Sequence, residues 1–342
     1  MGLSEYMHLC MADPRHGYYQ RQEPIGGKGD FITAPEVSQM FGELIGVWCI
    51  QAWKGMGKPQ KFNLVELGPG KGTMMSDILR AAQASPEFVK AANVVLVESS
   101  PKLQATQRTQ LGNQHLWIED ISKIPSGPSI FIANEFLDVL PFRQYIKHKT
   151  QWLERAVDAD DSRELKSTIG ASALDPRLLP EGHDAEPDGS VFEIAPAREA
   201  IMQMVAEKTA EQGGAALFID YGHTASGFGD TFQAIMDHKF ADPFAEPGKA
   251  DLTNHVDFSP LVKVAKTANC QTFAILTQGE FLLNLGLLER AGVLGQKENE
   301  AARARLTAEA ERLALPDQMG DLFKCFAFSR DAIELPPFAI DD

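Results

Sequence analysis

One glycine-rich stretch, residues 65–73, constrains the fold of this chain more than any other segment. It reads Val-Glu-Leu-Gly-Pro-Gly-Lys-Gly-Thr, with apolar residues before it and a helical pattern of apolar residues after it. A strand, a glycine turn and a helix in this order form the first half of a nucleotide-binding βαβ unit. Glycine suits this turn because a Cβ atom would hinder both the sharp bend and the close approach of a ligand to the backbone.

The spacing of the glycines argues against two common phosphate-binding motifs. Dinucleotide enzymes use G-x-G-x-x-G, and an ATP-binding P-loop needs Ser or Thr directly after Gly-Lys. Here Gly68, Gly70 and Gly72 form G-x-G-x-G, and Glu66 precedes them. A carboxylate at this place would repel a pyrophosphate but suits a cation, so S-adenosylmethionine, with its sulfonium and ammonium groups, fits better. The alternative is a tight turn without a ligand, and the glycines alone do not decide between the two.

Two further acids follow apolar runs and are candidates for the rest of the cofactor. Residues 93–98 form an apolar run that ends in Glu98 and is typical of a buried parallel strand. In such folds an acid at the end of the second strand accepts hydrogen bonds from ribose hydroxyls, so Glu98 is the predicted ribose ligand. Alternatively, Glu98 stabilises the start of the next helix, and the two roles are compatible. Asp120 could accept from an adenine amino group while Ile121 packs on the ring, and a loop acid without a ligand is the alternative.

The N-terminal part contains a second candidate for the cofactor site. Residues 3–11 have helical spacing, a glycine-rich loop follows at residues 26–30, and a helix is expected over residues 37–53 with Pro35 in its opening turn. Loops rich in Gly and Thr beside aromatic residues are often functional. We therefore predict that Gly29, Thr33 and Pro35 belong to a lid over the cofactor; a structural Ω-loop without ligand contact is the alternative.

Polar residues after the predicted fourth strand, residues 129–133, are candidates for the chemistry. Asn134, Glu135 and Asp138 follow this strand, and residues at the carboxyl ends of strands in an open α/β sheet face the ligand crevice. Methyl transfer needs a neutral nucleophile held in line with the sulfonium carbon, and paired carboxylates would fix a guanidinium by bidentate hydrogen bonds. Alternatively Asn134 caps a helix and Glu135 lies in its first turn.

The second half of the chain supplies the remaining strands and the predicted substrate residues. Residues 147–188 are acidic and polar and predict an antiparallel insertion, and residues 215–223 predict the fifth strand. We place Tyr221 and His223 on the substrate side; His238 could be a substrate contact, although a lone histidine is more often structural. A sixth strand (272–276), a helical cap (281–286), an amphipathic helix (298–315) and a last strand (322–328) complete a seven-stranded, mostly parallel sheet.

The expected division of the chain follows from these elements. It comprises residues 1–60 (N-terminal helices and lid loop), 61–146 (first half of the core), 147–212 (acidic insertion and helix), 213–228 (core strand), 229–257 (substrate-side loop), 258–330 (end of the core with a helical cap) and 331–342 (tail).

Composition limits the partners and the compartment. With 342 residues, the chain can form one domain with insertions or two. Its net charge of −15 argues against a nucleic-acid backbone or an anionic membrane as the main partner. No apolar stretch is long enough to cross a bilayer and no targeting peptide opens the chain. We expect a cytoplasmic protein, or one of the mitochondrial matrix if a presequence has been removed.

The cysteines and histidines do not predict a metal site. Cys10, Cys49, Cys270 and Cys325 form no C-x-x-C pair, and the eight histidines show no H-E-x-x-H. The cysteines are therefore expected to be free, buried thiols in a reducing compartment.

Several stretches together resemble a known family. They are Asp-Pro at 13–14, Gly-Tyr-Tyr at 17–19, residues 29–36, 66–73, 133–138, 220–222, 251–253, 256–258 and 277–279. Over nearly the whole chain the sequence resembles the MidA family of S-adenosylmethionine-dependent methyltransferases, which includes the mitochondrial protein-arginine methyltransferase needed for respiratory complex I assembly.

The resemblance implies a fold, a cofactor and an activity. It implies a Rossmann-like class I methyltransferase core, a lid at residues 29–35 and a cofactor held by Glu66, Gly68, Gly70 and Glu98. It also implies that Asn134 and Glu135 border the acceptor, most simply an arginine of a respiratory-complex subunit or its bacterial counterpart. Mitochondrial members often have Arg where this chain has Gln233, so the identity of the substrate stays open.

Two other functions are compatible with the sequence. One is methylation of a small molecule, and the other is an assembly factor that keeps the cofactor pocket without catalysis. The intact glycines and Glu66 argue against a vestigial pocket. A protein substrate is expected, membrane insertion is not, and the Leu-rich segment 281–288 is compatible with a homodimer or with a buried cap.

Overall fold

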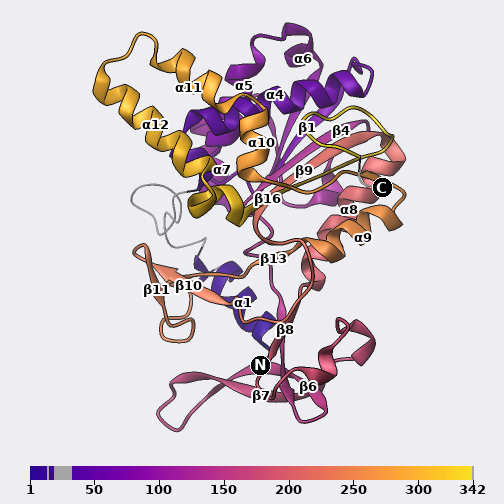
Figure 1. The fold of residues 1–342 in the computed structure, drawn as a ribbon, viewed down its shortest axis with the longest axis vertical. Coiled ribbons are helices and arrows are strands. Elements are labelled where there is room, and N and C mark those ends of the chain that lie inside the picture. The colour runs from indigo at the N-terminus through magenta and orange to yellow at the C-terminus, as the bar shows by residue number, and fades with distance from the viewer. Residues whose placement is uncertain (14, 19–32, 341–342) are drawn as a thin grey trace.

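A central sheet organises the computed structural model, which describes residues 1–13, 15–18 and 33–340 (Figure 1). Seven strands follow one another in the order β14-β16-β9-β4-β1-β2-β3. They are β1 (Phe62–Leu67), β2 (Ala92–Val97), β3 (Leu116–Ile118), β4 (Ser129–Asn134), β9 (Gly214–His223), β14 (Gln271–Thr272) and β16 (Phe323–Ser329). β1, β2, β3, β4 and β9 pair in parallel, whereas β16 runs antiparallel to β9.

Two short strands extend this sheet. β13 (Val256–Asp257) pairs with the end of β9, and β15 (Leu276–Thr277) pairs with β16. The predicted α/β core with a mostly parallel sheet is confirmed. The predicted number of seven strands holds for the continuous path, but the described residues form nine strands in this sheet.

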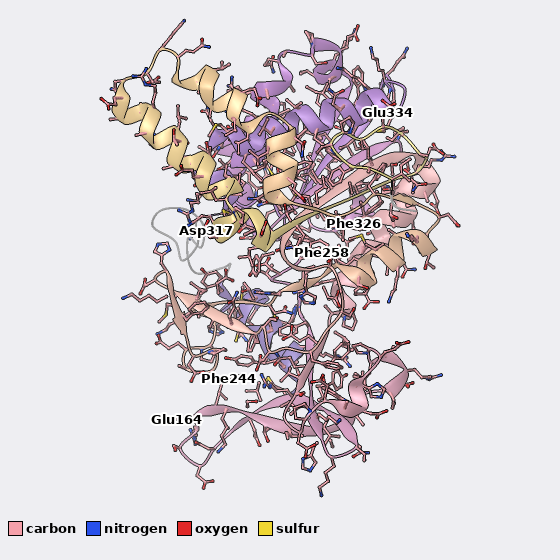
Figure 2. The ribbon with its side chains drawn as sticks, in the orientation of Figure 1. Glu164, Phe244, Phe258, Asp317, Phe326 and Glu334 are labelled. Atoms are coloured by element: carbon pink, nitrogen blue, oxygen red, sulfur yellow. The ribbon has the colours of Figure 1, made fainter. Side chains whose placement is uncertain are left out.

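Both faces of the sheet are buried, which explains why its strands are apolar without interruption. Alternate residues of β1 enter different cores: Leu64 packs with helices α4 (Gln39–Gly55) and α5 (Thr73–Ala82), and Val65 packs with α8 (Pro196–Gln212) and α9 (Phe258–Thr267). Phe258 of α9 and Phe326 of β16 both lie in the second core (Figure 2). All four cysteines are free and buried, as predicted.

The described part of the chain contains seven further α-helices. They are α1 (Leu3–Ala12), α3 (Ala34–Val37), α6 (Pro86–Ala91), α7 (Pro101–Leu111), α10 (Gln278–Asn284), α11 (Leu287–Gly295) and α12 (Glu300–Ala314), with short turns η1 (Ile121–Lys123), η2 (Pro176–Leu178), η3 (His183–Ala185) and η4 (Pro316–Gly320). None of the helices that the structure describes is both long and apolar enough to cross a bilayer.

Two predicted elements differ from the structure. The helix expected over residues 37–53 begins at Gln39, because Ser38 adopts an extended conformation and its side chain accepts from the Met40 N–H. Pro35, expected in the opening turn of this helix, lies in the separate short helix α3. The strand expected over residues 272–276 is divided into β14 and β15. Between them Ala274 donates its N–H to the carbonyl of Ala339, so the chain turns towards its C-terminal segment instead of continuing the ladder.

Two smaller sheets lie beyond the carboxyl ends of the core strands. The acidic stretch contributes β6 and β7 to an antiparallel sheet with the order β7-β6-β5-β8; its pattern predicts antiparallel strands, but β5 begins before this stretch and β8 follows it. A second sheet has the order β11-β10-β12. Their strands are β5 (Arg143–His148), β6 (Gln151–Ala159), β7 (Leu165–Ala173), β8 (Val191–Ile194), β10 (Gln233–Met236), β11 (Lys239–Ala241) and β12 (Asp251–Thr253). Helix α1 lies between the two sheets and shares a core with both (Figure 1). The boundaries of the predicted segments stay a prediction.

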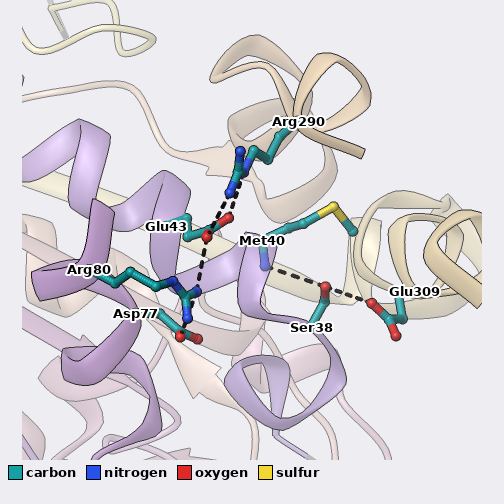
Figure 3. A network of polar contacts seen from close by, with 7 residues as sticks. All are labelled: Ser38, Met40, Glu43, Asp77, Arg80, Arg290 and Glu309. Atoms are coloured by element: carbon teal, nitrogen blue, oxygen red, sulfur yellow. Dashed lines mark hydrogen bonds and ion pairs between the residues drawn. The ribbon is translucent and has the colours of Figure 1, made fainter. Parts of the chain in front are cut away.

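A polar network ties the helical cap α10–α12 to the core (Figure 3). Glu43 of α4 is buried and accepts hydrogen bonds from Arg290 of α11 at 2.7 and 2.9 Å and from Arg80 of α5 at 2.9 Å. Ser38 donates to Glu309 of α12 at 2.8 Å. Burial raises the pKa of Glu43, but the hydrogen bonds and charges of Arg290 and Arg80 outweigh it, so the pKa lies below its ordinary value.

Replacing Glu43 by glutamine tests how much this network stabilises the fold. We expect Glu43→Gln to lower the free energy of unfolding at pH 7 by about 1–2 kcal/mol, because both arginines are partly hydrated and keep part of their interactions. The pKa of Glu43 is depressed on folding, so this contribution is present above the pKa of the unfolded chain and is lost as the pH falls through the folded pKa.

Urea unfolding of the wild-type protein and the variant at a series of pH values measures this difference. Glu207→Gln, an exposed glutamate on α8, is the matched control and should change stability little. A difference that stays the same on acidification would contradict an ionic contribution.

Candidate active site

The glycine turn between β1 and α5 has the backbone geometry that its sequence predicts. Gly68, Gly70 and Gly72 have φ values of +63°, +53° and +86°, which residues with a side chain rarely adopt. A Cβ atom on Gly68 would lie 2.7 Å from the ring of Phe136. The turn therefore packs directly against the loop that follows β4, and the two candidate regions of the sequence share one site.

A cavity lies over this turn. Five of the predicted cofactor residues line it: Thr33, Pro35, Glu66, Gly68 and Gly70. Four others in the described part of the chain do not line it: Gly72, Glu98, Asp120 and Ile121. Gly29 lies outside the described residues. The predicted residues Asn134 and Glu135 also line the cavity, together with Glu36, Pro69, Lys71, Thr73 and Met74. The N-terminal segment is held here by a 2.6 Å hydrogen bond from Thr73 Oγ1 to Glu36 Oε1.

The wall of the cavity carries two buried oxygen atoms without a partner in the described structure, Glu66 Oε2 and Asn134 Oδ1. Glu66 is almost completely buried, and burial raises its pKa to about 8. Buried polar atoms are nearly always hydrogen-bonded, so unpaired ones require an explanation. A bound group with N–H donors or positive charge would supply the missing partners, and this fits the cation that the sequence predicts.

Glu135 occupies a strained position between the two candidate regions. Its φ is +49°, in the left-handed region that a glutamate rarely adopts. Its Oε1 atom accepts hydrogen bonds from the Ala34 N–H and from Asn134 Nδ2, both at 3.0 Å. Burial raises the pKa of Glu135 to about 7, and the Ala34 N–H opposes that shift. This carboxyl group can therefore release or take up a proton near neutral pH.

Asp138 and Tyr221 form a buried pair behind the cavity. The Tyr221 hydroxyl donates to Asp138 Oδ2 at 2.7 Å, and Asp138 Oδ1 has no partner among the described residues. Burial raises the pKa of both groups. Tyr221 thus contacts the loop after β4, and neither residue lines the cavity that the structure describes. Their predicted catalytic and substrate roles stay predictions.

Asp220 and Arg198 hold the loop that carries these residues. Asp220 is fully buried, and its Oδ2 atom accepts from the backbone N–H groups of Leu137 at 2.9 Å and of Asp138 at 3.2 Å. Arg198 donates to the carbonyl oxygens of Leu137 at 2.7 Å and of Asp138 at 3.2 Å, and also to the carbonyl oxygens of Asn254 and His255. One carboxylate thus binds the N–H groups of the loop, and one guanidinium binds its carbonyl groups.

The predicted adenosine residues have defined positions beside the glycine turn. Glu98 is buried; its Oε1 atom accepts from the Ser100 N–H at 2.7 Å, so its predicted role at the start of the next helix is confirmed. Asp120 is exposed and accepts from the Ser122 N–H at 2.7 Å, where it begins η1. Ile121 is buried in the core. Their contacts with a cofactor stay predictions.

The two predicted substrate histidines lie at the surface. His223 is partly exposed at the end of β9, 4.0 Å from Asp257. His238 has a φ of +60° and lies in the exposed turn between β10 and β11. Among the described residues, neither histidine lines the cavity with Glu135. No group of three or more His, Cys, Asp or Glu suited to a metal ion occurs within the described ranges.

Comparisons with known proteins show the family of this chain. A family model described as "Putative S-adenosyl-L-methionine-dependent methyltransferase" matches residues 44–276. Two relatives carry the name "Protein arginine methyltransferase NDUFAF7, mitochondrial". The Xenopus laevis protein is 37% identical to this chain, over 95% of this chain and 80% of the relative. The Homo sapiens protein is 35% identical, over 98% of this chain and 84% of the relative.

A solved structure supports the same assignment. A Burkholderia thailandensis protein crystallised with S-adenosyl-homocysteine has a TM-score of 0.84 and 26% identity, over 100% of this chain and 92% of that one. The resemblance noted in the sequence is thereby confirmed, and the chain belongs to this family of S-adenosyl-L-methionine-dependent methyltransferases.

Proposed function

We propose that this protein transfers a methyl group from S-adenosylmethionine to an arginine side chain of a protein, and that Glu135 binds the arginine. The observation that carries this proposal is the position of Glu135 in the wall of the cavity that Glu66 and the glycine turn also line. The names of the relatives, which are protein arginine methyltransferases, support the same acceptor.

The residues of the site divide into two groups in this proposal. Glu66, Gly68, Gly70, Thr33 and Pro35 would hold the cofactor, whose sulfonium supplies an electrophilic methyl group. Glu135 would orient a guanidinium through hydrogen bonds and take up the proton that the attacked nitrogen loses. Asn134 fixes the direction of this carboxylate through its own hydrogen bond.

The place of action and the partners are proposed from the same family. The relatives are named mitochondrial, and we place this protein in the mitochondrial matrix or in the cytoplasm of a bacterium. A subunit of respiratory complex I is the first acceptor to test. A homodimer through residues 281–288 also stays a proposal. Leu283 and Leu288 have exposed side chains, whereas Phe281, Leu282 and Leu287 are buried.

Labelled methyl donor identifies the acceptor. The purified chain is incubated with S-adenosylmethionine carrying a labelled methyl group and with lysate from cells that lack the gene, and labelled residues are identified by mass spectrometry. We expect label in methylarginine. Label in the protein-free fraction would instead support a small-molecule methyltransferase, and saturable cofactor binding without transfer would support a non-catalytic assembly factor.

Gly70→Val tests the cofactor assignment. We expect this variant to lose S-adenosylmethionine binding, because the branched side chain would enter the space where the backbone meets the ligand. Calorimetric titration measures the affinity, and thermal unfolding shows whether the variant folds. Gly127→Val is the matched control: Gly127 also has a positive φ, of +128°, but open space surrounds its Cβ position. Unchanged affinity in Gly70→Val would refute the assignment.

The pH dependence of binding tests the role of Glu66. Its pKa lies at about 8 without a ligand, and a bound cation favours the ionised form, so binding requires proton release below this pH. We expect the affinity for S-adenosylmethionine to rise between about pH 6 and pH 7.5, by at most about tenfold per pH unit.

The variant Glu66→Gln should flatten this rise. Glu207→Gln, on the exposed face of α8, should retain it. Calorimetry at several pH values in buffers of different ionisation enthalpy also counts the protons released. An equally steep rise in Glu66→Gln would show that another group is responsible.

Glu135→Gln separates catalysis from cofactor binding. We expect the variant to bind S-adenosylmethionine within about threefold of the wild-type affinity but to lose methyl transfer, because the amide keeps the size of the side chain and loses the charge and the proton acceptor. Asp77→Asn, a buried carboxylate beside Arg80 on α5, serves as the control for transfer. Full turnover of Glu135→Gln on an identified acceptor would exclude a catalytic role.

A further inference from the structure

We infer that Gln107 is a positioning residue that aligns the glycine turn with Glu98 for binding of the adenosine part of the cofactor; this inference rests on the proposed function of the cavity. Gln107 lies on α7 and is completely buried. No sequence motif marks it, and it is not a predicted ligand. Its importance comes from the three elements that its single amide group connects.

The amide of Gln107 contacts the carboxyl ends of three neighbouring strands. Its Nε2 atom donates to the carbonyl oxygen of Gly70 at 2.7 Å, in the turn after β1. The same atom lies 3.3 Å from Oε2 of Glu98, after β2. Its Oε1 atom accepts from Nε1 of Trp117 in β3 at 2.9 Å. One side chain therefore sets the relative positions of the turn, the predicted ribose acid and the third strand.

Glutamine is the residue type that these partners require. The indole N–H of Trp117 can only donate, so it orients the amide with its oxygen towards Trp117 and its two N–H groups towards Gly70 and Glu98. A glutamate would place a second carboxylate beside that of Glu98. A leucine of similar size would leave the Gly70 carbonyl, Glu98 Oε2 and the Trp117 N–H without this partner in a buried region.

The surroundings hold Gln107 in place. A Cβ atom on Gly72 would lie 3.2 Å from Leu111, one turn further along α7, so this helix packs closely on the glycine turn. Gln104, one turn earlier, donates to the backbone carbonyl of Glu98 at 2.8 Å. The guanidinium carbon of Arg108 lies 4.5 Å from the ring centre of Trp117. α7 thus contacts both Glu98 and Trp117 through several side chains.

The consequence for binding concerns the direction and the charge of the Glu98 carboxylate. The Ser100 N–H engages Oε1 and Gln107 engages Oε2. The Ser99 N–H is a third donor to this carboxylate. A carboxylate has about four lone-pair sites, so about one remains for a hydroxyl donor such as that of a ribose. Burial raises the pKa of Glu98, and the hydrogen bonds from Ser100 and Gln107 oppose that shift. Gln107 therefore helps to keep Glu98 ionised as well as oriented.

A double-mutant cycle with calorimetric titration tests the inference. S-adenosylmethionine and adenosine are titrated into the wild-type protein, Gln107→Leu, Glu98→Gln and the double variant. We expect Gln107→Leu to weaken binding of both ligands by about tenfold, because buried acceptors lose their donor. The losses should be less than additive in the double variant, because part of the effect of Gln107 passes through Glu98 and part through the Gly70 carbonyl.

Two further variants distinguish positioning from loss of folding. Gln107→Glu keeps the size of the side chain and its acceptor for Trp117, and it should also weaken binding while the thermal unfolding temperature shows that the protein is folded. Gln144→Leu is the control, since Gln144 is equally buried and its amide also donates to a carboxylate, that of Glu193 at 2.6 Å, in the sheet of β5–β8.

The pH profile gives a readout that a purely structural role would not change. Without the hydrogen bond from Gln107, the pKa of Glu98 rises, so the affinity of Gln107→Leu should fall more steeply on acidification than that of the wild-type protein.

The possible outcomes separate this inference from the proposed function. Unchanged affinity in both folded Gln107 variants, or additive losses in the double variant, would overturn the inference while leaving the cofactor assignment intact. If the wild-type protein shows no saturable binding of S-adenosylmethionine, the proposed function fails and the inference fails with it.

Discussion

Asp220 and Arg198 hold the loop that follows β4, and this loop begins with Glu135. The loop after β4 has left the sheet, so its backbone groups have no ladder partners, and buried backbone groups must be paired. Asp220 satisfies the N–H groups of Leu137 and Asp138, and Arg198 satisfies their carbonyl groups. A buried charge has a high desolvation cost. Burial raises the pKa of Asp220, and the positive charge of Arg198 opposes that shift.

This arrangement explains how Glu135 keeps an unfavourable backbone conformation. A left-handed φ at a glutamate persists only where the surrounding structure determines it. After Glu135, the loop is bound by Asp220 and Arg198. Before it, Asn134 ends β4, and the Glu135 N–H itself donates to the carbonyl of Ile219 in β9. The carboxyl group is then directed towards Ala34 in the N-terminal segment. The strained residue is also the one whose pKa burial brings to about 7, which is the combination expected of a functional group.

The sequence predicts well those features that depend on local pattern. The left-handed φ of Gly68, Gly70 and Gly72 follows from the glycines themselves, and the parallel core follows from apolar runs separated by helical segments. Polar residues at strand ends meet because carboxyl ends of parallel strands share one edge, and this correctly brought Glu66, Asn134 and Glu135 to one cavity.

Features that depend on distant partners could not be predicted in this way. Arg198 and Gln107 lie on helices whose patterns show no special position, and their roles come from carbonyl and carboxylate groups far away in the sequence. The division of the strand expected over residues 272–276 has the same cause, because the competing partner is Ala339 near the end of the chain. The break at Ser38 does carry a local signal, because serine is a common N-cap residue. The Pro-Glu pair at residues 35–36 is also typical of a helix start, so the pattern fits two starting points.

The short segment around α3 connects parts of the molecule that the sequence separates widely. Its Ala34 N–H donates to Glu135 after β4, Glu36 accepts from Thr73 at the start of α5, and Ser38 donates to Glu309 of the cap. These three contacts are hydrogen bonds, each involving a carboxylate, so each depends on charge as well as position. A change in the protonation of Glu135 therefore alters a contact of the same segment that lines the cavity. If Glu135 takes up a proton as proposed, that step is coupled physically to the wall of the proposed cofactor site.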